Sequence, residues 1–370
     1  MEKVLFLTNA LYLDTRNREG GVRNCTNEFI DLLSQRFEVV RFPVTNHISI
    51  PYRLRVRLGL NHYNDYKPEL YRDRLKEAIR KDGIRLVFLN LSNTVTFAPL
   101  LKELGDIKVI LCSHGNETGD FLHQVVRFRG DNSYFKNLFS TYTLGRLFKI
   151  EAAYRVSGID MALTVSPVED SLEKWLGAKN TFMVPRVIKK DPLPLKPMTN
   201  RVGFLGDISH TPNQKGVLDL CDALMEMQHN IEFRLVGGPE EIGRSIADKY
   251  PFVKYLGFLD EGQLREEAAS WAFFLNLVFY YSRGVSTKLA KALGWGLPVL
   301  STVAGNRGYE WKEGTLLVAR DARHMAGLIV ENAGNPDKIK MAQLETAKIV
   351  ASSPDFGVIM DELYPQLMHL

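Results

Sequence analysis

The sequence predicts an α/β protein with two doubly wound parallel sheets, one in each half of the chain. Short apolar runs alternate with amphipathic stretches from the start, as Val4–Thr8 and Val22–Ser34 show. Runs that are apolar at nearly every position are typical of parallel strands covered by helices on both faces. The alternation stops in the proline- and lysine-rich segment 189–200 and restarts at Val202–Leu205. A chain of 370 residues, 45% hydrophobic and 24% charged, has the length and composition of two globular domains.

We expect the first domain to span residues 1–188 and to alternate six strands with helices. The predicted strands are Val4–Thr8, Phe37–Phe42, Leu86–Asn90, Val109–Ser113, Ala162–Ser166 and Phe182–Pro185. The predicted helices are Val22–Ser34, Pro68–Lys81, Tyr134–Val156 and Val168–Leu176. Because ligands of such sheets bind beyond the carboxyl ends of the strands, the loops that follow the strands are the candidate site.

Residues 189–200 are predicted to be a linker, and residues 201–352 a second domain of the same kind. Its predicted strands are Val202–Leu205, Phe233–Val236, Val253–Tyr255, Phe273–Leu277, Pro298–Ser301 and Thr315–Val318. Its predicted helices are Gly216–Met227, Pro239–Tyr250, Gln263–Ser270 and Ser286–Gly294. Residues 353–370 are expected to form a last helix that packs back on the first domain. The expected architecture is two doubly wound domains that face each other across a cleft.

Composition excludes several other classes of protein. The longest apolar run, Trp271 to Tyr281, is too short to span a bilayer. The first residues have no basic flank or small-residue cleavage site and predict a strand rather than a signal peptide. Three widely spaced cysteines offer no zinc or disulfide pattern and fit a reducing compartment. We therefore expect a cytoplasmic protein, with peripheral contact to the inner face of the membrane as an option.

Charge is unevenly distributed between the two halves. Residues 1–190 contain 29 basic and 21 acidic residues, whereas the remainder contains 18 and 22. A basic half indicates an anionic partner, which on charge alone is a phosphorylated lipid, a membrane surface or nucleic acid. Nucleic acid is disfavoured because no nucleic-acid motif accompanies the basic residues. The predicted contact surface consists of two basic segments, one with Arg53, Arg55 and Arg57 and the other with Arg127 and Arg129. A solvated edge strand is the alternative explanation for the segment with Arg53, Arg55 and Arg57.

Two glycine-containing loops are candidate anion sites. Gly20 and Gly21 precede the predicted helix at Val22, where free N–H groups could meet an anion, although an ordinary turn explains them equally well. The segment from Gly206 to Gly216 crosses from a strand to a helix and contains Asn213 and Lys215. Lys215 is predicted to lie beside the anion at the start of that helix, with a solvated lysine as the alternative.

The strongest local signal is the start of the helix at Ser286. Ser286 or Thr287 can cap this helix, and Lys288 falls in its first turn. A cation at that end opposes the helix dipole, so its placement makes sense if an anion binds there. A diphosphate would interact with Lys288 and with two or three backbone amides. A lysine that extends into water is the alternative.

Several motifs, in order, resemble the GT-B glycosyltransferases of the large retaining group known as family 4. The resemblance covers nearly the whole chain, and it is carried by the order and spacing of motifs that are individually weak. The matching positions are Gly20, Gly21, His114, Gly115, Glu151, Asp160, Ser166, Gly206, Pro212, Asn213, Gly216, Val236–Pro239, Gly257, Lys288, Gly305 and Gly308.

The resemblance implies a retaining glycosyltransferase that uses a UDP- or GDP-sugar as co-substrate, without a cofactor or an obligatory metal. Lys288 would stabilise the departing diphosphate, and His114 would contact the donor sugar or orient the acceptor. The donor would also meet Gly21, Lys215 and the amides of Ser286 and Thr287. The acceptor would be a glycan or a lipid-linked glycan of surface polysaccharide or lipopolysaccharide synthesis. In such an enzyme the basic residues Arg53, Arg55, Arg57, Arg127 and Arg129 would surround the acceptor cleft or touch anionic lipid headgroups.

The sequence departs from the family at three positions. Many relatives have a Glu-x7-Glu pattern, in which the second Glu holds the ribose hydroxyls, but this chain has Arg283 and Lys291 there. An Arg that usually follows the opening Gly is Asp207 in this chain. The resemblance therefore places Lys291 in the donor site, with Glu310 or Glu313 as the substitute carboxylate. A nucleotide-sugar epimerase and a catalytically silent GT-B partner subunit are the alternative functions. A lectin-like protein is less favoured because the lysines at helix ends suit phosphate.

Overall fold

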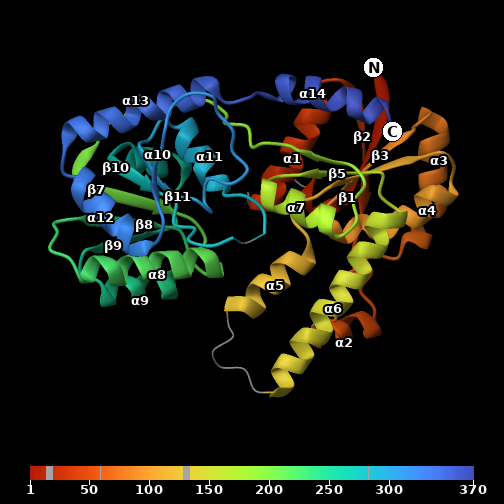
Figure 1. Ribbon diagram of the computed structural model, residues 1–370, viewed down its shortest axis with the longest axis horizontal. Coiled ribbons are helices and arrows are strands. Elements are labelled where there is room, and N and C mark those ends of the chain that lie inside the picture. The colour runs from red at the N-terminus through yellow and green to blue at the C-terminus, as the bar shows by residue number, and fades with distance from the viewer. Residues whose placement is uncertain (14–19, 59, 128–133, 282) are drawn as a thin grey trace. The chain divides into compact units, whose positions relative to one another are not determined.

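The computed structural model describes residues 1–13, 20–58, 60–127, 134–281 and 283–370, and the chain divides into two compact units (Figure 1). Unit 1 contains residues 1–185, Arg283 and Gly284, and the C-terminal segment Asp355–Leu370. Unit 2 contains Arg186–Tyr281 and Val285–Pro354. None of the helices within these described ranges is long and apolar enough to cross a membrane.

Unit 1 is built on a six-stranded sheet with the order β2-β1-β3-β4-β5-β6, in which each neighbouring pair is parallel. The strands are β1 (Glu2–Asn9), β2 (Phe37–Val44), β3 (Leu86–Asn90), β4 (Lys108–Cys112), β5 (Met161–Thr164) and β6 (Thr181–Met183). Every residue of β3 and β5 is buried, as expected for strands covered on both faces. The predicted strands of the first half are confirmed to within a few residues.

Unit 2 has a second six-stranded parallel sheet, with the order β12-β11-β10-β7-β8-β9. Its strands are β7 (Met198–Leu205), β8 (Glu232–Val236), β9 (Val253–Gly257), β10 (Trp271–Leu275), β11 (Val299–Thr302) and β12 (Leu317–Ala319). Strands β7 and β10 lie at the centre and contribute Phe204, Phe273 and Leu275 to a fully buried core. The predicted α/β class with two doubly wound sheets is therefore confirmed.

The helices connect the strands in the alternating order that parallel sheets require. In unit 1 they are α1 (Gly21–Leu33), α2 (Ile50–Arg57), α3 (Arg72–Asp82), α4 (Ala98–Glu103), α5 (Glu117–Arg127), α6 (Tyr134–Ser157), α7 (Pro167–Trp175) and α14 (Phe356–Met368), with 3₁₀ turns η1 (Ala10–Tyr12), η2 (Pro68–Tyr71) and η3 (Ser92–Phe97). In unit 2 they are α8 (Thr211–Met225), α9 (Glu240–Lys249), α10 (Glu261–Ala269), α11 (Thr287–Gly294), α12 (Ala322–Asn332) and α13 (Pro336–Ser352).

The C-terminal helix α14 packs on unit 1 although the chain reaches it from unit 2. Arg36, just after α1, forms a 2.6 Å ion pair with Asp361, and the Phe37 and Tyr364 rings are 5.6 Å apart. Figure 1 shows α14 beside α1 and β2 of unit 1, whereas α6 extends away from the sheet. Burial of Met360 and Leu363 of α14 anchors the contact.

One alternative and one predicted boundary are wrong. The solvated edge strand given as the alternative for Arg53, Arg55 and Arg57 is instead the helix α2. Ser49 accepts a hydrogen bond from the Tyr52 N–H, and Pro51 occupies the first turn. Pro at this position favours a helix start because its missing N–H is not needed there. The helix predicted from Gly216 begins five residues earlier, at Thr211, and again has a proline in its first turn.

Candidate functional site

Lys288 lies in the first turn of α11, at the carboxyl edge of the sheet of unit 2. Its side chain is partly buried and passes over Gly206, where an added Cβ would lie 3.0 Å from Lys288 Cδ. The ammonium nitrogen donates a 2.7 Å hydrogen bond to Oδ1 of Asn213, in the first turn of α8. It lies 5.5 Å from the centre of the Phe204 ring. The structure therefore brings together three predicted site residues, Lys288, Gly206 and Asn213.

The charge of Lys288 is not neutralised by the protein. Within the described residues no carboxylate pairs with this ammonium group, and its one polar partner is a neutral amide. Burial lowers the pKa of Lys288 from 10.5 to about 8, against a weaker opposite effect of Asp207. A desolvated cation beside the positive end of a helix dipole is unfavourable without an anion. The arrangement is thus suited to bind an anionic group.

A buried amide fixes the start of α11. Asn276 directly follows β10, is fully buried, and its Oδ1 accepts a 2.8 Å hydrogen bond from Ser286 Oγ. Its Nδ2 donates to Ser301 Oγ of β11 at 2.9 Å, and an added Cβ at Gly305 would lie 2.5 Å from this nitrogen. Ser286 occupies the N-cap position but does not cap the helix with its side chain, which corrects the sequence prediction for this residue.

The N-terminal amides of α11 are partly occupied. The Tyr309 hydroxyl accepts a 2.9 Å hydrogen bond from the Ala290 N–H and donates to the Ser286 carbonyl. The N–H groups of Thr287 and Lys288 have no hydrogen-bond partner in the part of the chain that the structure describes. These two amides and the Lys288 ammonium group are therefore available to the same anion.

Other predicted donor residues do not join this cluster. Lys215 lies in the second turn of α8 and pairs with Asp219 at 2.9 Å, and Lys291 pairs with Glu261 at 3.3 Å. Lys215 is thus placed as its alternative, a solvated lysine, describes, and both lysines form ion pairs at the surface. Glu310 is exposed, and Gly308, with φ of +80°, accepts a 2.8 Å hydrogen bond from the Arg186 N–H through its carbonyl. Glycine suits that left-handed backbone, so Gly308 shapes the loop.

His114 lies at the carboxyl end of β4 in unit 1 and is buried. Its Nε2 is 2.8 Å from Oδ1 of Asn90, at the end of β3. The Asn90 Nδ2 donates to the hydroxyls of Thr8 and Thr26, at 2.8 and 2.9 Å. These two bonds orient the amide so that its oxygen faces the imidazole, which assigns the proton to Nε2 of His114. The ring also packs 5.5 Å from Phe29 of α1.

The loop after His114 is held from three sides. The buried Glu151 of α6 accepts hydrogen bonds from the N–H groups of Glu117 and Thr118, at 2.8 and 3.1 Å, so its carboxylate caps α5. The Tyr63 hydroxyl donates to the same carboxylate. Ser92 Oγ donates to the Gly115 carbonyl at 2.8 Å. The start of α5 is therefore already occupied by a carboxylate of the protein itself.

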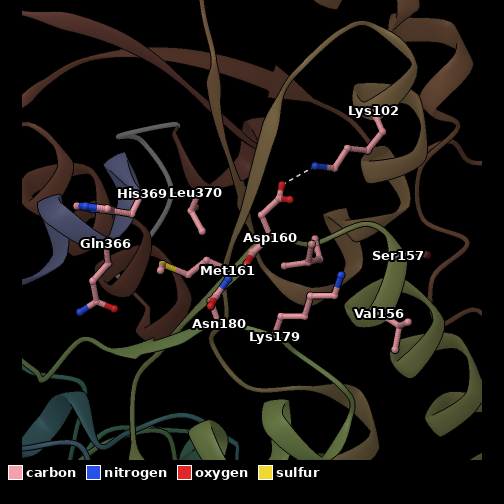
Figure 2. Close-up of a pocket in the computed structure, with 11 residues that line it drawn as sticks. Lys102, Val156, Ser157, Asp160, Met161, Lys179, Asn180, Gln366, His369 and Leu370 are labelled. Atoms are coloured by element: carbon pink, nitrogen blue, oxygen red, sulfur yellow. Dashed lines mark hydrogen bonds and ion pairs between the residues drawn. The ribbon is translucent and has the colours of Figure 1, made fainter.

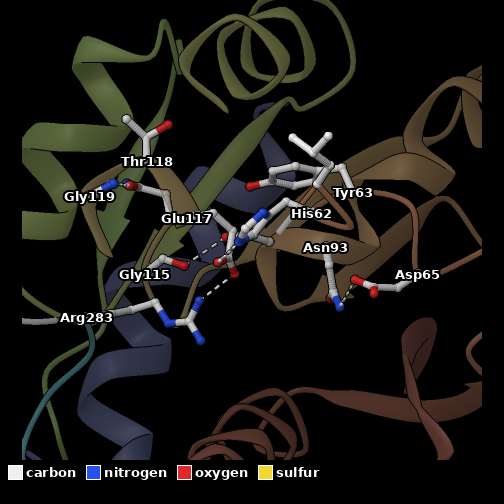
Figure 3. A network of polar contacts seen from close by, with 12 residues as sticks. His62, Tyr63, Asp65, Asn93, Gly115, Glu117, Thr118, Gly119 and Arg283 are labelled. Atoms are coloured by element: carbon white, nitrogen blue, oxygen red, sulfur yellow. Dashed lines mark hydrogen bonds and ion pairs between the residues drawn. The ribbon is translucent and has the colours of Figure 1, made fainter. Parts of the chain in front are cut away.

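Arg283 completes this loop and was noted in the sequence only as a departure from the family. Its guanidinium pairs with Glu117 at 2.5 Å, and His62 lies 3.8 Å from the same carboxylate (Figure 3). An added Cβ at Gly115, where φ is +107°, would lie 2.2 Å from the Arg283 side chain. The close approach of that side chain and the left-handed backbone therefore both require glycine at position 115. Glu117 is a site residue that sequence reasoning missed.

The remaining predicted residues of unit 1 lie on exposed surface where the structure describes them. Gly20 and Gly21 form the N-cap and first residue of α1 and are exposed, and an added Cβ at Gly20 would meet nothing. Arg53, Arg55 and Arg57 are exposed on α2. The side chain of Arg127 and the whole of Arg129 are outside the described residues.

A pocket of about 420 Å³ lies at the opposite edge of the sheet of unit 1 (Figure 2). Asp160 and Lys102, which line it, precede β5 and β4, so the pocket is at the amino ends of the strands. These two residues form an ion pair at 2.5 Å. The pocket is therefore distinct from the edge that contains His114. Among the described residues no cluster of three or more His, Cys, Asp or Glu could hold a metal ion.

Comparison with known proteins identifies the part of the chain that holds the Lys288 cluster. Residues 199–335 match the family model described as Glycosyl transferases group 1. This segment is therefore similar to the group 1 glycosyl transferases. Gly206, Asn213, Ser286 and Lys288 all lie within the matched segment, as does the departure at Lys291. A search of curated proteins finds no match to the chain.

Solved structures extend the similarity to the whole chain. Sucrose-phosphate synthase (tll1590) from Thermosynechococcus elongatus is 17% identical with a TM-score of 0.68, each chain being covered in full. Anabaena Alr3699/HepE, solved in complex with UDP and glucose, is 14% identical with a TM-score of 0.63, again over both full chains. The lipopolysaccharide outer core galactosyltransferase WaaB is 11% identical with a TM-score of 0.54, over 95% of this chain and 99% of that one. The predicted GT-B fold is confirmed.

Proposed function

We propose that the chain is a retaining glycosyltransferase that moves a sugar from a UDP- or GDP-sugar to a glycan or lipid-linked glycan. The single observation that carries this proposal is the partly buried, unneutralised ammonium group of Lys288 at the start of α11, inside the segment that matches the group 1 glycosyl transferases. A nucleotide diphosphate supplies the anion that this cation lacks. The Anabaena HepE structures contain UDP and UDP-glucose, which supports a uridine nucleotide as the first donor to test.

The chemistry follows from the charge that develops during transfer. Negative charge builds on the diphosphate as the glycosidic bond to the donor sugar breaks. Lys288 and the free amides of Thr287 and Lys288 stabilise that charge, and they do so most strongly in a site partly shielded from water. The departing phosphate accepts the proton of the acceptor hydroxyl on the same face of the sugar, so configuration is retained. His114, fixed by Asn90, orients a sugar at the edge of unit 1.

The surface of α2 supports a lipid-linked acceptor and a peripheral membrane contact. Ile50, Leu54 and Leu58 recur every four residues and are 85%, 57% and 52% exposed. Arg53 and Arg57 flank this apolar stripe, and α2 contains no acidic residue. An exposed apolar stripe with flanking arginines suits an anionic membrane surface, where each basic residue contributes about 1 kcal/mol. Sedimentation with vesicles that contain anionic lipid tests this contact, and Leu54→Glu should abolish it.

Nucleotide-sugar binding is the primary test. UDP- and GDP-sugars should raise the melting temperature of the wild-type chain, and one of them should be slowly hydrolysed, as mass spectrometry can detect. Lys288→Ala should abolish both effects. Lys254→Ala removes the same charge from an exposed position of β9 and should leave both unchanged. No response of the wild type to any nucleotide sugar would count decisively against the proposal.

A catalytically silent partner subunit is the second candidate. It is favoured by the ion pairs Arg283–Glu117 and Lys291–Glu261, which occupy the two positions where the family pattern has carboxylates. This candidate predicts no turnover with any donor, even when Lys291→Glu restores the family residue. Turnover by the wild type with a single donor excludes it.

A further inference from the structure

One segment of unit 1 crosses the carboxyl ends of three neighbouring strands. Tyr66 is 3.1 Å from the Asn9 amide at the end of β1, and Asp65 is 3.1 Å from the Asn93 amide after β3. His62 approaches Glu117 after β4, at 3.8 Å. Figure 3 shows the Asn93 and Asp65 side chains pointing toward each other. Residues 61–66 therefore lie at the edge where parallel α/β sheets bind their ligands.

The Asp65 carboxylate is oriented but not neutralised. The Tyr52 hydroxyl of α2 donates to Oδ1 at 3.0 Å, and Asn93 Nδ2 donates to Oδ2. Both donors are neutral, and within the described residues no basic side chain forms an ion pair with Asp65. Each carboxylate oxygen has a second lone pair and can accept a further hydrogen bond. The acceptor capacity that remains suits a hydroxyl group.

Other groups around Asp65 have the same chemistry. Asn93 Oδ1 and His62 Nδ1 are buried atoms that have no hydrogen-bond partner among the residues the structure describes. Tyr12 and Tyr66 supply partly and fully buried aromatic rings, and burial raises the pKa of both hydroxyls, with a further contribution from Asp65. Amides, aromatic rings and an oriented carboxylate are suited to an uncharged polyol, because each hydroxyl both donates and accepts.

Basic side chains approach this segment, but none forms an ion pair with Asp65 within the described residues. Arg283 is paired with Glu117 and is also influenced by Asp120. Arg55 of α2 donates to Asn64 Oδ1 at 2.7 Å, and Arg146 of α6 donates to the carbonyls of Leu60 and His62 at 3.3 and 3.5 Å. The Asp65 carboxylate therefore keeps its negative charge, and like-charge repulsion disfavours a phosphate or carboxylate group bound directly against it.

We propose that Asp65 is a specificity-determining residue, which binds the hydroxyl groups of an uncharged glycosyl acceptor and excludes acceptors with a phosphate or carboxylate at the bound sugar. The inference rests on the proposed function, in which unit 2 binds the nucleotide and unit 1 the acceptor. Because Tyr52 joins Asp65 to α2, the sugar site and the surface proposed to meet the membrane belong to one segment.

Saturation-transfer NMR without nucleotide tests the inference. The probes are the methyl glycosides of glucose, galactose, mannose and rhamnose, with methyl glucuronide and glucose 1-phosphate as charged counterparts. The wild type should give signals from at least one neutral glycoside and none from the charged probes. Loss of a charge-assisted hydrogen bond in Asp65→Asn should weaken neutral binding about tenfold or more and relax the exclusion of charged probes.

Asp73→Asn, which removes an exposed carboxylate from α3, is the matched control and should behave as wild type. A thermal melt of each variant checks that the fold is retained. The inference is overturned if the wild type binds charged probes alone or no glycoside, or if folded Asp65→Asn binds neutral probes unchanged. Measuring UDP and GDP binding to the same samples distinguishes failure of the Asp65 inference from failure of the proposed function. Nucleotide binding with no neutral glycoside binding rejects only the role of Asp65, whereas loss of nucleotide binding rejects the proposed function.

Discussion

The pH dependence of nucleotide binding is a direct consequence of the Lys288 environment. Burial places the pKa of this lysine at about 8 in the free protein. About nine-tenths of the side chains are then charged at about pH 7, and about one-tenth at about pH 9. A bound diphosphate requires the charged form, and its negative charge raises the pKa of Lys288 in the complex. The affinity for UDP or GDP should thus fall about tenfold between these two pH values, or about 1.4 kcal/mol.

Isothermal titration calorimetry of the wild type and of Lys288→Met measures this effect. Because Lys288→Met should not bind the nucleotide, the ionisation of the free nucleotide is measured separately by pH titration, and its contribution is subtracted to isolate the lysine. Titrations near pH 8 in buffers of different ionisation enthalpy should also reveal uptake of about half a proton per bound nucleotide by the wild type. A wild-type affinity that changes with pH only as the ionisation of the nucleotide requires would refute the reasoning, as would tight nucleotide binding by Lys288→Met.

The same lysine should make the free protein less stable. Its pKa in the folded state lies below the value of 10.5 in the unfolded chain, so the unfolded chain binds more protons between about pH 8 and 10.5. The contribution of Lys288 to stability is therefore unfavourable below pH 8 and improves as the pH rises through this window. The lowered pKa of Lys288 corresponds to a loss of at most about 3 kcal/mol in the free energy of unfolding below pH 8. Lys288→Met should accordingly raise the melting temperature of the free protein while it abolishes nucleotide binding.

Three further substitutions test the surroundings of the two edges. Arg155 and Glu173 form an ion pair in which both side chains have no exposure, so Arg155→Met leaves a buried carboxylate without its cation. The free energy of unfolding in urea should fall by about 3–5 kcal/mol, and the double variant Arg155→Met with Glu173→Leu should recover most of this loss. Leu91 has φ of +78° and ψ of 149°, so Leu91→Gly should relieve strain and raise the free energy of unfolding by about 1 kcal/mol; an unchanged or lower value contradicts this. Gly206→Ala would place a Cβ 3.0 Å from Lys288 Cδ and should weaken nucleotide binding in calorimetry more than it lowers the melting temperature.

The sheets could be predicted from sequence because their signal is local. Strand β3 reads Leu-Val-Phe-Leu-Asn, is buried at each position, and was predicted with the correct ends. A parallel strand covered on both faces must be apolar throughout, so its sequence reports its environment directly. The position of Lys288 in the first turn of α11 was also predictable, because Ser286 and Thr287 mark a helix start, and its role at an anion site stays a prediction.

Helix α2 shows where local patterns mislead. Arginine alternates with Leu and Val from Arg53 to Arg57, which is the period of a half-buried strand. None of the residues of α2 is buried, so neither face selects the period, and Ser49 and Pro51 decide the structure instead. A period of two indicates a strand only when one face meets a core. The apolar side chains of α2 are exposed for the same reason.

The arrangement of Asp65 and Glu117 at the carboxyl edge of the sheet of unit 1 could not be predicted, because their contacts join distant parts of the chain. Glu117 meets Arg283 across 166 positions, and Asp65 meets Asn93 across 28. Neither acidic residue stands in a motif that marks it. Arg283 was visible in the sequence only as a reversal of charge relative to the family pattern, and its partner explains how that reversal is accommodated: a carboxylate from the loop after β4 lies against it.

The two edges differ in charge in the way a transfer reaction requires. The edge of unit 2 presents an unneutralised cation, Lys288, and the edge of unit 1 an unneutralised carboxylate, Asp65. A protein that only binds another subunit has no need for the buried Lys288 cation, since a desolvated charge without a carboxylate partner destabilises the free fold. Under the proposed function, this cation binds the anionic donor, and the Asp65 carboxylate, held by Tyr52 and Asn93, binds the uncharged acceptor. If Lys288→Met stabilises the free protein and loses only the nucleotide, while Asp65→Asn loses only the sugar, the silent partner is disfavoured and donor binding explains the cost of the Lys288 charge.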